Sequence, residues 1–116
     1  MDRLIKASPG FCEETFVYLM QNCRSGLFKI GRSNNVIKRE RALQSADPDI
    51  ELLDFIRAHP VWETDLHRRF RSFKVRGEWF RLGAKELRDI QELFALKINR
   101  DRKIKDLCTR PAVALG

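Results

Sequence analysis

The first two-thirds of the chain contains several residues whose side chains can bind ions or transfer protons. They lie, in this order, in Val17-Tyr18-Leu19 and Lys29-Ile30-Gly31 and at Arg39, Glu63 and His67. Arginine binds phosphate through a bidentate fork, a carboxylate can hold a divalent cation, and tyrosine, lysine or histidine can transfer a proton. These types suit hydrolysis of a phosphodiester, which needs an activated water, charge neutralisation and help for the leaving oxygen. Taken singly, each residue also has an ordinary structural explanation.

The elements that must position these residues can be predicted from apolar patterns and turn formers. Residues 15–21 and 27–32 are rich in β-branched and aromatic residues, and the turn chemistry of 22–26 joins them into a hairpin. N-cap candidates at 33–35 precede a basic helix over 36–46, in which Ile37 and Leu43 are expected to face the core. A third strand is predicted over 50–58.

The second half of the chain is predicted to be mainly helical. Pro60 suits the start of a helix to about Phe73, and a short extended piece is predicted over 79–82. A long amphipathic helix is predicted over 84–107, with Ile98 in its apolar stripe. The fold class is therefore α+β, with a small three-stranded antiparallel sheet flanked by helices. We expect one domain over 15–107, with its core over 15–82, after a lead-in (1–14) and before a tail (108–116).

The ordered set of residues resembles the GIY-YIG endonuclease superfamily over roughly residues 15–82. The similarity is to the branch found in phage reading frames and in fungal meiotically up-regulated genes. The matching residues are Tyr18, Lys29-Ile30-Gly31-Arg32-Ser33, Arg39, Leu43, Glu63, Leu66-His67, Phe70 and Gly77-Glu78-Trp79-Phe80. The first motif departs from the superfamily's Gly-Ile-Tyr, and Lys29 stands where a second tyrosine is usual.

The resemblance implies a small α+β nuclease domain in which Glu63 holds one divalent cation, Mg²⁺ or Mn²⁺. Mg²⁺ suits a single carboxylate because it keeps several of its waters. Tyr18 is implied as the water-orienting base or its relay, and a nearby cation would have to lower its pKa from near 10. Lys29 would supply that charge or act as the base itself. His67, one helical turn after Glu63, either touches the substrate or simply packs.

Arg39 is the residue that the resemblance places on the scissile phosphate. Its rivals are Arg32, beside Gly31, and Arg41; the eight-residue spacing from Gly31 selects Arg39. Arg39 and Arg41 lie on different helical faces, so only one of them can point into a site. Gly31, Arg32, Arg41 and Arg68 remain candidate substrate-binding residues, with solvated surface charge as the alternative for the arginines.

The Gly77-Glu78-Trp79-Phe80 signature is expected to be structural, closing the core with its two aromatic residues. Two basic runs, at 67–76 and 97–105, could each follow a phosphate backbone, although a solvated face is the default for both. The second run has no interleaved aromatic residues, which argues against a stacking platform for single strands there.

Composition bounds the remaining choices. The 116 residues carry a formal net charge of +7, which favours a polyanionic partner. Three cysteines without a CxxC pair predict reduced thiols, and no signal peptide or membrane span is expected. Together with what the resemblance implies, these features lead us to expect a cytoplasmic, metal-dependent endonuclease that acts on DNA. The alternatives are a weak or inactive nucleic-acid-binding module and a small inhibitor in phage–host conflict; the sequence does not give the oligomeric state.

Overall fold

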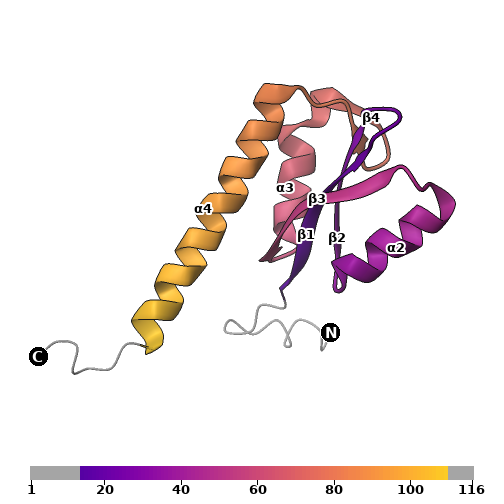
Figure 1. Ribbon diagram of the computed structural model, residues 1–116. Helices are drawn as coiled ribbons and strands as arrows, with labels where there is room; N and C mark the ends of the chain where they lie inside the picture. Colours follow the sequence, from indigo (N-terminus) through magenta and orange to yellow (C-terminus); the bar gives the residue numbers. More distant parts are fainter. Residues whose placement is uncertain (1–13, 110–116) are drawn as a thin grey trace, which may run out of the picture.

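The computed structural model describes residues 14–109, and for 106–109 it describes the backbone alone. The predicted lead-in up to residue 13 and the tail from residue 110 lie outside the described residues. The elements follow in the order β1 (Thr15–Asn22), β2 (Phe28–Ser33), α2 (Val36–Ala46), β3 (Ile50–Ala58), α3 (Val61–Arg69), the 3₁₀ turn η1 (Arg71–Phe73), β4 (Lys74–Arg76), β5 (Trp79–Phe80) and α4 (Ala84–Thr109) (Figure 1).

The predicted hairpin forms, and its register decides which side chains share a face. Asn22 closes the turn, because its side-chain oxygen accepts hydrogen bonds from the backbone N–H groups of Arg24 (2.9 Å) and Ser25 (3.1 Å). Across the antiparallel pair Tyr18 lies opposite Gly31, and Met20 lies opposite Lys29. Paired residues on neighbouring strands point to the same side of a sheet, so the hairpin alone brings two predicted motifs together.

The sheet has five strands rather than the predicted three. Its order is β3-β1-β2-β5-β4, and each neighbouring pair is antiparallel. Of the two additional strands, β5 lies within the short extended piece predicted over 79–82, whereas β4, with three residues, is too short to show the alternation that marks a strand in sequence. Gly77, with φ of 55°, makes the tight turn between them.

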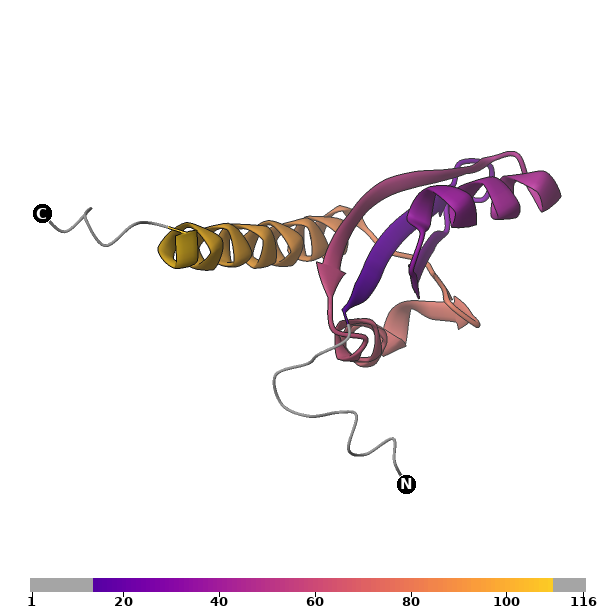
Figure 2. The same ribbon diagram turned by 90° about the horizontal axis from the view of Figure 1, so that it is seen from below.

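The two faces of the sheet are covered by different helices. One face joins α3 and α4 in a core whose members include Val17, Leu19, Ile30, Phe80, Ile90 and Phe94. On the other face Tyr18 and Met20 pack with Val36 of α2 and Ile50 of β3. Figure 2 shows α2 and α4 on opposite sides of the strands. The alternation along β1 therefore sends Tyr18 to the face that carries α2.

Helix α2 starts where predicted, but the residue that it buries is Val36 rather than Ile37. Asn35 is the N-cap, and its side chain accepts a hydrogen bond from the backbone N–H of Lys38 at 3.0 Å. Val36 is buried and Leu43 is half-buried, whereas Ile37 is 49% exposed, so the prediction that Ile37 faces the core is wrong. A carboxylate oxygen of Glu40 accepts the backbone N–H of Leu52 at 2.8 Å and ties the helix to β3.

The other two helices differ from prediction in length and in burial. Helix α3 ends at Arg69, short of the predicted Phe73, and the chain continues through η1. Helix α4 packs on the body through Ile90 and Phe94, and its second half projects away from the sheet (Figure 1). Ile98 is exposed, because by that point the stripe has passed the edge of the core.

Within residues 14–109, no helix combines the length and the apolar character needed to cross a membrane.

Replacing Phe94 with alanine should lower the free energy of unfolding by about 3–5 kcal/mol, because the ring is fully buried between α4 and the sheet. Leu96 lies two residues on in the same helix and is 64% exposed, so Leu96→Ala should change that energy by less than about 0.5 kcal/mol. Urea unfolding followed by circular dichroism measures both. Equal losses would contradict docking of α4 through this face.

Candidate active site

The site is organised by a close approach between two neighbouring strands. Tyr18 is 2% exposed, and its ring leans across Gly31 on β2. A Cβ atom at Gly31 would lie 2.6 Å from the Tyr18 hydroxyl oxygen and 2.7 Å from Cζ. No side chain fits in that space unless the buried ring moves. Glycine is therefore required here by the tyrosine, which explains why both motifs occur together.

Lys29 and Glu78 form an ion pair beside this contact. Lys29 Nζ lies 2.8 Å from Glu78 Oε1 and 5.5 Å from the centre of the Trp79 ring. Glu78 Oε1 also lies 3.0 Å from the point where a Gly31 Cβ would be, so the carboxylate and the Tyr18 hydroxyl flank the same small space. Glu78 thus belongs to the site, although its signature was expected to be structural. Glu78 is the sole acid in residues 67–81, which hold six Lys and Arg residues. This isolated acid is the feature of the sequence that could have indicated an ion pair at the site.

The environment of Tyr18 favours the neutral phenol. Burial raises the pKa of Tyr18 from 10.0 to about 12; the negative charge of Glu78 adds to this shift, the positive charge of Arg39 opposes it, and Glu63 adds a smaller increase. The expected lowering of this pKa by a nearby cation is therefore not found in the protein alone. The same interactions place Arg39, Glu63 and Glu78, from three separate elements, within electrostatic reach of one hydroxyl group.

Glu63 occupies the first turn of α3 with one carboxylate oxygen engaged. Its Oε1 accepts a hydrogen bond from Arg32 Nε at 3.0 Å, whereas Oε2 lies 3.8 Å from His67 Nε2, beyond hydrogen-bonding distance. The side chain is 15% exposed. Among the described residues, no three His, Cys, Asp or Glu side chains gather in a group that could hold a metal. A cation that needs one carboxylate and keeps its waters fits Oε2, and this is how Mg²⁺ is commonly bound.

His67 is fixed to the edge of β2. Its Nε2 lies 2.8 Å from the carbonyl oxygen of Ile30 and so carries the proton that it donates there. Its ring stands edge-on to Phe80, with centroids 4.9 Å apart. The imidazole thereby satisfies a strand carbonyl just where β5 stops pairing with β2. Proton transfer through Nε2 would have to break this bond.

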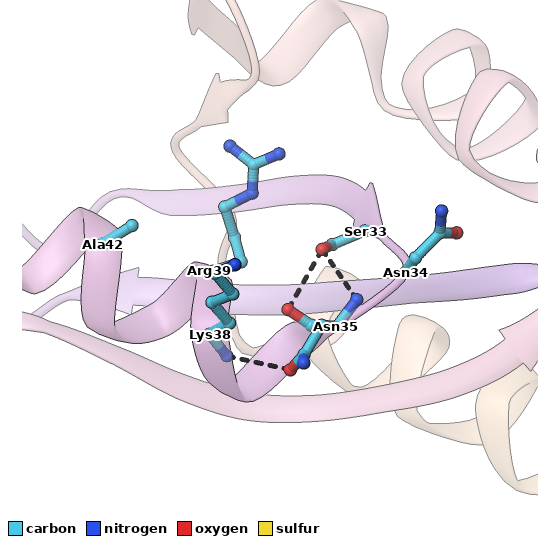
Figure 3. Close-up of a pocket in the computed structure, with 6 residues that line it drawn as sticks. All are labelled: Ser33, Asn34, Asn35, Lys38, Arg39 and Ala42. Atoms are coloured by element: carbon cyan, nitrogen blue, oxygen red, sulfur yellow. Dashed lines mark hydrogen bonds between the residues drawn. The ribbon is translucent and has the colours of Figure 1, made fainter.

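Arg39 lines a cavity of about 370 Å³ between the end of β2 and the start of α2 (Figure 3). The other lining residues are Ser33, Asn34, Asn35, Lys38 and Ala42. The Arg39 side chain extends away from the helix, and within residues 14–109 it has no hydrogen-bond or ion-pair partner. Arg41 is exposed and is not among the lining residues, in line with the expectation that only one of the two can face a site.

The structure thus gathers most, but not all, of the predicted site residues. Tyr18, Lys29 and Gly31 share the face of the hairpin that carries α2, on which Arg39 lies. Arg32 lies opposite Val17 on the other face of the hairpin, where it pairs with Glu63 of α3. Arg68 instead pairs with Asp65 at 3.5 Å on the exposed side of α3. The arrangement can bind an anion through Arg39 and hold a cation at Glu63, with a phenol, an ammonium group and a second carboxylate between them.

Titration of the single tyrosine in the chain should show the effect of its surroundings. Ultraviolet difference absorbance in metal-free buffer should give a pKa for Tyr18 of about 12 in the wild type and a lower value in Glu78→Gln, because a negative charge is removed. Since the folded pKa is raised, the associated stability is fully present below pH 10 and is lost as the pH rises toward 12.

The matched control for this titration is Glu92→Gln on α4, which should leave the pKa of Tyr18 unchanged. Tryptophan fluorescence on the same samples shows whether the chain is still folded at each pH. A tyrosine pKa at or below 10 in the folded wild type would contradict the described burial of this hydroxyl.

Residues 15–95 match one protein-family model, which is described as the T5orf172 domain. Comparisons with curated proteins and with solved structures give no match. The match covers well over half of the chain, including both strands of the hairpin, α2, α3 and the first part of α4. The chain therefore belongs to the T5orf172 domain family, a phage-associated family related to nucleases of the GIY-YIG and HNH types.

Proposed function

We propose that this protein is a metal-dependent endonuclease that hydrolyses phosphodiester bonds in DNA, with Mg²⁺ or Mn²⁺ as its cofactor. Family membership supports a nuclease-like or DNA-binding role at a coarser level. The observation that carries the finer proposal is that the Tyr18 hydroxyl and Glu78 Oε1 flank the same small space beside Gly31, with Arg39 and Glu63 near enough to influence the pKa of Tyr18. A cation, two carboxylates and a phenol from separate elements are more than packing of the hairpin requires.

Arg39 is the residue proposed to bind the scissile phosphate. Its guanidinium lines an open cavity and has no acidic partner among the described residues, so an incoming phosphate breaks no existing ion pair there. Arginine matches phosphate with two parallel hydrogen bonds, which fixes the orientation of the group as well as its charge. Arg32, by contrast, is engaged with Glu63 before any substrate arrives.

Glu63 is the residue proposed to hold the divalent cation, through Oε2 and with Arg32 moving away from Oε1. Arg32 is half-exposed and can reorient at small cost, since a pair of this kind contributes little to stability. A bound cation of this type neutralises charge on the phosphate and on the leaving oxygen.

Tyr18 and Glu78 are proposed to handle the attacking water. With a pKa of about 12, Tyr18 is a neutral phenol at neutral pH, so it orients a water molecule by hydrogen bonding and does not remove its proton. The carboxylate of Glu78 flanks the same space beside Gly31 and would accept that proton as the new P–O bond forms and the P–O bond to the leaving oxygen breaks. Lys29 holds this carboxylate in position at 2.8 Å.

A second candidate function is a nucleic-acid-binding module that does not cleave. The specific observation in its favour is the Arg32–Glu63 ion pair, which in this structure occupies the only carboxylate proposed for the metal. Such a module would bind phosphate through Arg39 and would gain nothing from added Mg²⁺.

Glu63→Gln should abolish nicking of supercoiled plasmid by the purified protein in Mg²⁺ or Mn²⁺, because the amide cannot replace the charge that holds the cation. Glu92→Gln, an exposed change on α4, should retain wild-type activity. Gel electrophoresis of the plasmid, with and without EDTA, gives the readout. Nicking that is unaffected by EDTA or by Glu63→Gln would sink the proposal.

Arg39→Gln should lower the rate of cleavage by about 100-fold or more while weakening DNA binding much less, if the guanidinium acts on the transition state. Arg41→Gln removes the same charge from the same helix but lies outside the cavity, so its cleavage rate should stay within a few-fold of wild type. Single-turnover rates and binding in EDTA separate the two effects. Equal losses of rate and binding would reduce Arg39 to an anchoring residue.

A further inference from the structure

Positive charge is concentrated in one short stretch of the chain. Residues 67–81 hold six of the 23 Lys and Arg residues and a single acid, Glu78, which gives this stretch a net charge of +5 where the whole chain has +7. All six cations are exposed, and Arg68 pairs with Asp65. The other five have no acidic partner among the described residues: Arg69, Arg71, Lys74, Arg76 and Arg81. We call these five the β4 surface.

The β4 surface is continuous in space because its elements adjoin. Arg69 is the last residue of α3, Arg71 begins η1, and Lys74 and Arg76 lie on β4, the outer strand of the sheet. The backbone N–H of Arg81 donates to the carbonyl of Phe73 at 2.8 Å, which brings the chain after β5 back against η1. Figure 1 shows the end of α3 beside β4.

This surface borders the candidate active site. Arg76 pairs in register with Trp79, and Trp79 pairs with Lys29, so three adjacent strands lead from the outer edge to the site. Glu63 and Arg69 also lie at opposite ends of α3, about 9 Å apart along the helix axis. A polyanion that reaches the site can therefore continue across these cations.

The other basic run, on α4, differs in both placement and pairing. Lys97 is only 11% exposed and pairs with Glu14 and Asp101. Lys85 pairs with Asp89 on the same helix. Figures 1 and 2 both place the C-terminal end of α4 on the far side of the molecule from β4. The two runs, which look alike in sequence, therefore cannot form one surface.

We propose that the β4 surface binds the sugar–phosphate backbone of duplex DNA alongside the site, an inference that rests on the proposed function for the identity of the polyanion. Closely spaced, unpaired cations release counterions when they meet phosphates, and this release drives binding that does not depend on base sequence. The α4 run takes no part in this contact. DNA approaches the sheet from its β4 edge.

The chemistry of the surface favours a duplex over a single strand. Single strands are held by aromatic side chains on which bases stack. The one aromatic residue among those described that is more than about a third exposed is Phe55, at 39%, on β3 at the opposite edge of the sheet. Within the basic stretch Phe70 and Phe80 are buried in the core, and the half-exposed Phe73 and Trp79 pack against the two core clusters, with Lys29 over the Trp79 ring. Contacts at the β4 surface are thus made to the backbone alone.

Protection of an exposed sheet edge is a structural alternative for part of this charge. Lysine and arginine on an edge strand prevent pairing with a second copy. That need is met by Lys74 and Arg76 and does not account for Arg69, Arg71 or Arg81, which lie outside β4.

The test compares two triple variants that remove the same charge. Arg71→Gln/Lys74→Gln/Arg76→Gln neutralises the β4 surface, and Arg100→Gln/Arg102→Gln/Lys103→Gln neutralises exposed cations at the end of α4. Fluorescence anisotropy in EDTA measures affinity for a labelled mixed-sequence duplex over a series of salt concentrations. The β4 variant should lose about two to three units of the slope of log K against log salt, and the α4 variant should lose less than one.

Three outcomes would overturn the inference. They are equal changes in slope for both variants, tighter binding of a single strand of the same sequence than of the duplex, and an aggregating β4 variant whose slope is unchanged. If the β4 triple variant fails to fold by circular dichroism, Arg69→Gln/Arg81→Gln is compared with Arg88→Gln/Arg100→Gln, with about one to two units of slope expected for the first pair. Binding in EDTA requires no cleavage, so a protein without nuclease activity refutes the proposed function and leaves this result standing.

Discussion

The contact between Tyr18 and Gly31 is the constraint on which the rest of the site depends. A buried ring can cross a neighbouring strand only where that strand has no side chain, and the 2.6 Å distance leaves no room for one. This crossing fixes the hydroxyl over β2, next to the ion pair of Lys29 and Glu78.

Charge in the site is arranged in pairs except at the cavity, where Arg39 and Lys38 have no acidic partner among the described residues. Lys29 is matched by Glu78, and Arg32 is matched by Glu63. Arg39 has no such match and faces a cavity. Binding an anion at Arg39 therefore breaks no ion pair, whereas binding a cation at Glu63 requires competition with Arg32.

The parts of the fold that a local sequence pattern determines were predicted from the sequence, whereas the parts that depend on tertiary packing were not. The hairpin, α2 and its Asn35 cap follow from local turn and capping chemistry. The extended piece over 79–82 is predicted, but a strand of two or three residues carries no periodicity from which its pairing in the sheet could be predicted. Val36 and Ile37 are adjacent apolar residues of α2, so the pattern does not decide which of them is buried. The place of Glu78 in the site depends on pairing between β2 and β5, which are separated by 45 residues in the chain.

Helix α4 gives the domain a rigid arm. Its first half is held by Ile90, Phe94 and the ion pairs of Lys97, and from there the helix continues to Thr109 without a break, about 18 Å further. A straight helix keeps its direction over such a length. A group joined to its far end, such as a fluorophore or a second module, would be carried away from the sheet along the direction of the helix axis.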